Sequence, residues 1–121
     1  MLGMFKKPTE PSNKLWLINL HVGRDANTEM PTNLAGAYVP VFVAAVDHES
    51  AAREAVSQVS RRGYKFLDIS DKKVHQLDPL KWDAYVRGSW PEFVSHFPTQ
   101  EEVFVGLAEG RVFFGPFAGY E

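Results

Sequence analysis

The sequence predicts one small α+β domain: a mainly antiparallel sheet of about four to five strands packed against one long helix and two or three short helices. Three observations support this class. The chain has 121 residues, 45% of them hydrophobic and 23% charged, which suits one globular core and is short for two. An almost uniformly apolar, β-branched segment covers 37–46. A helical apolar spacing follows it directly.

The expected domain covers 15–121 and is preceded by a flexible lead-in over 1–14, in which residues 6–14 are polar and contain two prolines. We expect a first strand over 15–22, a long polar loop over 24–36 and a second strand over 37–46. Pro40 is awkward in that strand because it cannot donate a backbone hydrogen bond. It indicates a bulge, or a position where the missing N–H would face outward.

The helix expected after Asp47 has the clearest signals in the chain. Asp47 can cap its N-terminus, and Glu49 lies in the first turn, where the helix dipole favours an anion. An apolar stripe recurs at helical spacing, and Gly63 can end the helix. The stripe residues are Ala52, Ala55, Val56 and Val59.

The second half of the chain predicts short elements. We expect strands over 64–69 and 74–77 around a turn at 70–73, then a helix over 80–87 after an Asp78 cap. A short helix is expected up to Phe97, and another begins at Thr99 with Glu102 completing a capping box. A final strand over 111–118 is interrupted by Gly115 and Pro116. Strands on one side of a helix layer would be the simplest packing of this order.

Charge and composition exclude several classes of protein. The net charge of −2 argues against nonspecific nucleic-acid binding, which requires a basic face. The absence of cysteine excludes disulfides, thiol nucleophiles and cysteine-ligated metals. No apolar segment is long enough to span a membrane, and no signal peptide is recognisable, so we expect a cytoplasmic protein. We expect no cofactor.

Motifs for catalysis or metal binding are absent from the sequence. The four histidines do not lie at metal-ligand spacing, and there is no phosphate-binding glycine loop or nucleophile elbow. We therefore assign neither catalytic nor metal residues. A His/Asp general-base pair, such as His75 with Asp71 or Asp68, has no support beyond the presence of these residues. RNA binding is a third, weaker reading, carried by a basic stretch with Arg61, Arg62, Lys65, Lys72 and Lys73.

Aromatic residues gather toward the C-terminus. Ten of the sixteen lie in 82–121. Phe113 and Phe114 would point to opposite faces of a strand, so both cannot enter a one-sided core. Either helices cover the second face as well, or one aromatic belongs to a partner or dimer surface.

Two resemblances extend this reading. The strand over 38–47, the Ala-rich helix beginning at Ala51 and the exit Gly63-Tyr64-Lys65-Phe66 resemble small ferredoxin-like domains over about 30 residues. By type rather than by motif, a small, acidic, cysteine-free, aromatic-rich α+β chain is also similar to bacterial toxin-immunity proteins. The first resemblance implies a ferredoxin-like variant of the fold, and the second implies an inhibitor of a toxin domain. Neither carries site residues.

The leading functional hypothesis is a protein-binding module of the immunity type. Residues 92–121 carry five acidic groups and one arginine, so we expect a basic protein partner that is steered by charge and held by aromatic side chains. A homodimer stays open. The predicted partner-binding residues are Asp25, Glu29, Glu101, Glu102, Phe117, Tyr120 and Glu121.

The alternative hypothesis is a small-molecule-binding protein or small enzyme with a pocket between sheet and helices. In that case His21 would act as acid or base. The predicted ligand-binding residues are Trp16, His21, Tyr38, Trp82 and Trp90.

Overall fold

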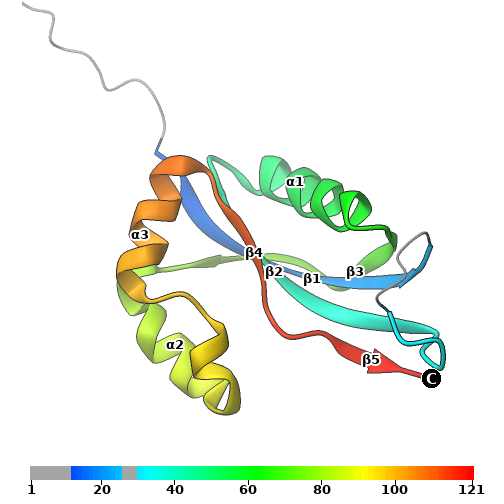
Figure 1. Cartoon of the computed structure of the whole chain (residues 1–121). Coiled ribbons are helices and arrows are strands. Elements are labelled where there is room, and N and C mark those ends of the chain that lie inside the picture. Colours follow the sequence, from blue (N-terminus) through cyan, green and yellow to red (C-terminus); the bar gives the residue numbers. More distant parts are fainter. Residues whose placement is uncertain (1–11, 26–29) are drawn as a thin grey trace, which may run out of the picture.

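One antiparallel sheet organises the chain in the computed structural model, which describes residues 12–25 and 30–121 (Figure 1). Its strands in these ranges are β1 (Lys14–Arg24), β2 (Gly36–Ala45), β3 (Tyr64–Leu77), β4 (Val112–Phe114) and β5 (Ala118–Tyr120). β1 lies between β3 and β2, and β4 and β5 both pair with the other edge of β2. The predicted α+β class is confirmed.

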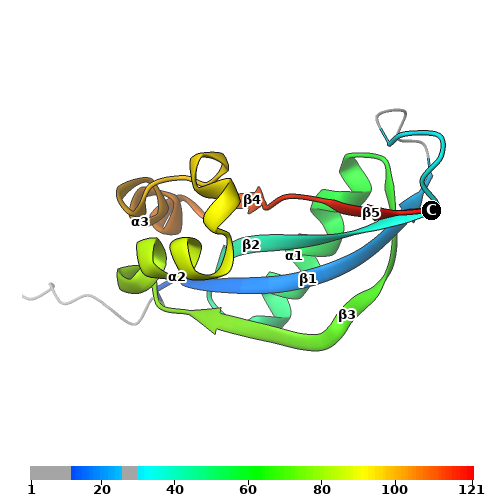
Figure 2. The ribbon, with the colours of Figure 1, turned by 90° about the horizontal axis from the view of Figure 1, so that it is seen from below.

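Helices lie on both faces of the sheet, and the expected one-sided helix layer was wrong (Figures 1 and 2). α1 (His48–Arg61) packs on one face. The other face meets α2 and α3 at one end of the sheet. The two α-helices at that end are α2 (Trp82–Ser89) and α3 (Gln100–Glu109). Two 3₁₀ segments precede them, η2 (Pro79–Lys81) before α2 and η3 (Pro91–His96) before α3. α1 has only 14 residues, so neither one long helix nor a ferredoxin-like arrangement is confirmed.

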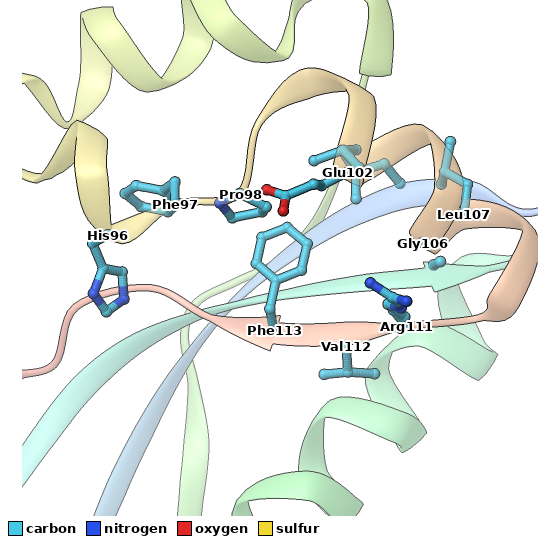
Figure 3. A pocket seen from close by; sticks show the side chains of 12 residues that line it. His96, Phe97, Pro98, Glu102, Gly106, Leu107, Arg111, Val112 and Phe113 are labelled. Carbon is cyan, nitrogen blue, oxygen red and sulfur yellow. The ribbon is translucent and has the colours of Figure 1, made fainter.

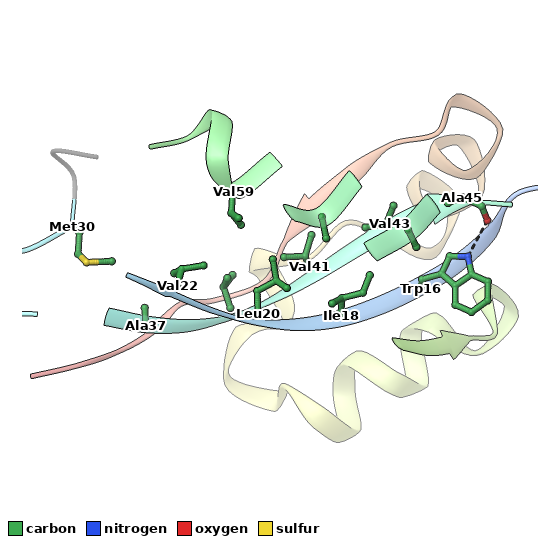
Figure 4. Packing of buried hydrophobic residues seen from close by; sticks show 13 residues of the cluster. Trp16, Ile18, Leu20, Val22, Met30, Ala37, Val41, Val43, Ala45 and Val59 are labelled. Atoms are coloured by element: carbon green, nitrogen blue, oxygen red, sulfur yellow. Dashed lines mark hydrogen bonds between the residues drawn. The ribbon is translucent and has the colours of Figure 1, made fainter. Parts of the chain in front are cut away.

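The core under α1 follows from the alternation of β1 and β2. Every second residue of β1, from Trp16 to Val22, points to α1 and is buried (Figure 4). The Trp16 indole N–H donates to the carbonyl of Ala45 at 2.9 Å, so its polar atom is satisfied within the core. The helix contributes Ala51, Ala55 and Val59, a stripe shifted from the predicted one, because Ala52 and Val56 are only partly buried.

A second core lies between the opposite face and the α2–α3 end of the chain. Leu15 and Leu17, two of the β1 positions on this face, join Phe42 there, and Trp82 is 1% exposed. Phe42 meets Trp82 edge to face at a centroid distance of 5.3 Å. Phe113 packs in this second core, whereas its neighbour Phe114 packs under α1. Of the two readings of these aromatics, helices covering both faces is therefore the one observed.

β3 is one long strand with a bulge, where the sequence suggested two strands around a turn. Ile18 pairs with Val74 and Leu20 with Ile69, so four residues of β3 stand opposite Asn19 alone. Both halves of β3 thus pair with β1, and they do not pair with each other. Lys72 has a φ of 60°, which turns the chain within the bulge. We call residues 70–73 the β3 bulge.

The edge strand breaks opposite Pro40. β4 ends at Phe114 and β5 begins at Ala118, and Pro40 lies between their pairing positions on β2. The Gly115 N–H donates to the Pro40 carbonyl at 2.8 Å. A Cβ on Gly115 would lie 2.6 Å from Pro40 Cγ, so only glycine allows this approach. Pro40 itself pairs with Asn19 in a continuous register, so the interruption lies in the neighbouring edge and β2 has no bulge there.

The ends of the predicted elements agree in part. The Asp47 cap of α1 and the Thr99–Glu102 capping box of α3 are present. α2 continues through Gly88, which was expected to end it. Most of the expected lead-in over 1–14 lies outside the described residues, and Lys14 already belongs to β1.

Candidate functional site

Half of the second sheet face has no helix over it. α2, η3 and α3 gather at the end that carries Leu17 and Phe42, while the end that carries Gly23 and Gly36 is open (Figure 2). We call this region the open face. It presents polar and aromatic side chains from four strands, because the alternation of β1 and β2 places Asn19, His21, Tyr38 and Pro40 opposite the α1 core.

His21 lies at the centre of the open face between two polar partners. Its Nε2 is 2.7 Å from the Tyr120 hydroxyl, and its Nδ1 is 3.5 Å from an Asp68 carboxylate oxygen. The Asp68 carboxylate favours the tautomer with the proton on Nδ1, which leaves Nε2 to accept the Tyr120 hydroxyl proton. The imidazole side chain is 20% exposed and Asp68 is 51% exposed. We call these three residues the Tyr120–His21–Asp68 triad.

Aromatic packing fixes the His21 ring. The Tyr38 ring stacks on it at a centroid distance of 4.7 Å and an interplanar angle of 18°. Tyr120 reaches His21 by crossing the sheet above Gly36, its pairing partner on β2. A Cβ on Gly36 would lie 2.5 Å from the Tyr120 hydroxyl oxygen and 2.8 Å from the Val22 carbonyl oxygen. Glycine at this position is therefore required for the Tyr120–His21 contact.

The β3 bulge adds a second polar cluster beside the triad. The Asp71 carboxylate accepts from Asn19 at 3.2 Å, from the Lys73 N–H at 3.1 Å and lies 2.6 Å from His75 Nε2. Desolvation alone would raise the pKa of Asp71, but the hydrogen bonds from His75, Lys73 and Asn19 outweigh it and lower that pKa below its ordinary value. This carboxylate ties the bulge to β1.

An open cavity of about 340 Å³ lies between the open face and η3. Tyr38 and Pro40 form part of its sheet side, and the aromatic side chains of Trp90 and Phe93 line it from the helical end of the chain. Trp90 packs against Phe97 at a centroid distance of 5.8 Å, and its indole N–H donates to the Tyr85 hydroxyl at 3.4 Å. Tyr38 is 45% exposed and Phe93 is 42% exposed. The remaining lining residues are Asn19, Val39, Ser70, Pro116, Phe117 and Ala118.

A second cavity, of about 400 Å³, lies between α3 and β4 (Figure 3). It is mainly apolar, and its polar side chains are Glu102, Arg111 and His96. Each has a partner within the protein. Glu102 accepts from the Thr99 N–H at 2.8 Å, Arg111 pairs with Glu109 at 2.7 Å, and His96 Nε2 is 3.2 Å from the Phe114 carbonyl oxygen. This cavity is larger, yet its polar groups already serve the fold.

The residues predicted for a ligand pocket separate into two groups. Tyr38 and Trp90 line one cavity, and His21 stacks on Tyr38. Trp16 and Trp82 lie in the two cores, on opposite faces of the sheet, and line neither cavity. Both were predicted as ligand-binding residues because they are large aromatics, but both are buried in the cores and do not belong to this site.

The residues predicted for partner binding do not form one surface. Glu101 and Glu102 lie on α3, at the opposite end of the molecule from the C-terminus (Figures 1 and 2). Glu121 accepts from Asn33 at 3.0 Å, and Tyr120 belongs to the triad. The Phe117 ring lies 5.2 Å from that of Tyr64, which packs under α1, and Phe117 also lines the cavity on the open face. Asp25 is exposed where β1 ends, and Glu29 lies outside the described residues.

Sequence reasoning missed Asp68 as the partner of His21. The pairing of His21 with Asp68 depends on two register shifts between β1 and β3, and no local signal reveals them. Alternation along the first strand did place Asn19 and His21 on one face, opposite the apolar positions, and this signal was available.

Comparison with protein-family models, with curated proteins and with solved structures gives no match to the chain. Within 12–25 and 30–121, no three His, Cys, Asp or Glu side chains lie together in a way that could hold a metal ion. No helix in the same ranges has the length and apolar character needed to cross a membrane.

Proposed function

We propose that this protein binds a small planar aromatic molecule in the cavity on the open face. One observation carries the proposal: aromatic side chains from a strand and from the helical end, Tyr38, Trp90 and Phe93, line one open cavity of about 340 Å³. That volume falls near the lower end of about 300–1,000 Å³ for ligand pockets, which suits one or two fused rings. This is the small-molecule alternative drawn from the sequence, with a changed set of residues.

The chemistry of the walls supports a planar ligand. Tyr38 is 45% exposed, and its hydroxyl has no hydrogen-bond partner among the described residues. It can therefore offer a ring face and a hydrogen bond to the same molecule. The Asn19 side chain already donates to Asp71, and the Ser70 hydroxyl already donates to the Asn19 carbonyl. These two residues therefore shape the cavity wall more than they offer hydrogen bonds to a ligand.

Two matched phenylalanines test the proposal. Phe93 is 42% exposed and lines the cavity, whereas Phe104 is 41% exposed on α3 and lines neither cavity. Calorimetric titration with indole, quinoline and naphthalene probes should give binding that weakens on Phe93→Ala and persists on Phe104→Ala. We expect a loss of about tenfold, as for removal of one stacked aromatic. Equal affinity of the two variants, or no binding of any probe, would contradict the proposal.

Protein binding is a second proposal with a narrower basis. It rests on the end of the sheet where Asp25, Tyr120 and Glu121 are exposed, because charge there could steer a basic partner. Glu101 and Glu102 do not support this surface. Charge reversal of Asp25 and Glu121 should slow association with a captured basic partner at low salt, and unchanged association would exclude it. An immunity role, a homodimer and a cytoplasmic location stay predictions.

A further inference from the structure

We propose that Tyr120 is a nucleophile that takes up acyl groups from activated esters, with His21 as its general base and Asp68 as the residue that positions His21. This goes beyond binding in the cavity and does not depend on it. The hydroxyl, the imidazole and the carboxylate stand in the order required of a nucleophile, a base and an orienting acid.

The hydrogen-bond geometry supplies the first argument. The Tyr120 hydroxyl and His21 Nε2 are 2.7 Å apart, within the range for direct proton transfer. Asp68 lies 3.5 Å from Nδ1, on the far side of the ring, and favours the tautomer in which Nε2 is free to accept. An ordinary surface tyrosine has no base within reach, so its phenol stays protonated at neutral pH.

Preorganisation supplies the second argument. His21 is held by the stacked ring of Tyr38, and Tyr120 is held above Gly36, where any side chain would displace it. Tyr120 is 37% exposed, so the residue is not sealed within the core. The site thus combines a fixed base with an accessible nucleophile.

The step can be written with p-nitrophenyl acetate as the acyl donor. The Tyr120 oxygen attacks the ester carbonyl carbon while its proton moves to His21 Nε2. The bond between that carbon and the p-nitrophenolate oxygen breaks, and p-nitrophenolate leaves with the electron pair. Tyr120 is left as its acetyl ester, and His21 returns its extra proton to solvent.

Tyr38 provides an internal control for the test. It is more exposed than Tyr120, at 45% against 37%, but it lacks a base hydrogen-bonded to its hydroxyl. If exposure alone decided reactivity, Tyr38 would be acetylated first. If Tyr120 only held β5 in place, its hydrogen-bonded hydroxyl would also react more slowly than that of Tyr38. Activation by His21 reverses both expectations.

The experiment measures acetylation of each tyrosine by peptide mass spectrometry after brief exposure of the full chain to p-nitrophenyl acetate. Tyr120 should react faster than Tyr38 by about 100-fold, the lower end for a positioned general base. His21→Gln keeps a hydrogen-bond acceptor but removes the base, so this ratio should collapse. Faster or equal reaction of Tyr38, or an unchanged ratio in His21→Gln, would overturn the proposal.

Asp68→Asn tests the positioning role separately. Asp68 is half exposed on an edge strand, so its amide should not disturb folding. The ¹⁵N shifts of the His21 ring should report loss of the Nδ1–H tautomer, together with slower acetylation of Tyr120. A retained tautomer with unchanged acetylation would remove Asp68 from the proposal. Probe binding in the cavity is measured by calorimetry, so failure of either proposal is seen independently.

Discussion

At the scale of single residues, two carboxylates contact the polar side chains of the open face. Asp71 receives three hydrogen-bonding groups from three positions of the chain, and an Asp68 carboxylate oxygen lies 3.5 Å from His21 Nδ1. The sequence raised both as partners of His75, and only Asp71 is in contact with it. Residue type could be read from the sequence, but the partner could not, because it depends on the length of the β3 bulge.

Asp71→Asn tests the first of these roles through pH. The pKa of Asp71 is lower in the folded protein, so its carboxylate stabilises the fold at pH values above the ordinary value of 3.8. That stability is lost as the pH falls through the folded-state value. Thermal unfolding should show a gap between wild type and variant at neutral pH that narrows below about pH 4. Asp83→Asn, an exposed carboxylate on α2, is the control, and an Asp71 gap independent of pH would be the contrary result.

Gly36 tests the close approach of Tyr120. An alanine there meets the Tyr120 ring and the Val22 carbonyl, whereas a Cβ on Gly88 meets nothing within 4 Å. Gly36→Ala should lower the free energy of unfolding by about 1–3 kcal/mol. Gly88→Ala should raise it by up to about 1 kcal/mol, because Gly88 lies inside α2. Urea unfolding of the two variants distinguishes them, and a neutral Gly36→Ala would refute the crowding.

At the scale of elements, signals carried within one segment predicted well. The Asp47 cap and the Thr99–Glu102 capping box each involve residues three apart, and both are present. The prediction of two strands in place of β3 was wrong. Residues 70–73 have the sequence of a turn, and only the pairing of β3 with β1 makes them a bulge. The expected one-sided helix layer was also wrong, although the opposite orientations of Phe113 and Phe114 had left open that helices cover both faces, as they do.

Thr99→Ala tests the capping box. The Thr99 hydroxyl accepts from the Glu102 N–H at 3.2 Å, and the Glu102 carboxylate accepts from the Thr99 N–H at 2.8 Å. We expect the free energy of unfolding to fall by about 1 kcal/mol. Thr99→Ser keeps the hydroxyl and should lose much less in the same urea titration. Equal losses would mean that the methyl group, and not the cap, carries the effect.

At the scale of the whole molecule, one sheet separates two cores and leaves one region uncovered. α1 packs along one face, whereas the shorter helices gather at one end of the other face (Figure 2). The open face exists because of this mismatch in cover. It collects the polar residues of β1 and the tyrosines of β2 and β5, and the cavity beside η3 is its boundary. Tyr38 and Trp90 were predicted from the sequence as ligand-binding residues, and the topology places both at one cavity.

The most direct test is a ¹⁵N–¹H correlation spectrum of the chain during titration with quinoline. We predict shifts concentrated at Asn19, Tyr38, Ser70 and the Trp90 indole N–H, with the indoles of Trp16 and Trp82 unmoved in their cores. Shifts concentrated at Leu107, Val112 and Arg111 would place the ligand in the cavity beside α3 and contradict the account.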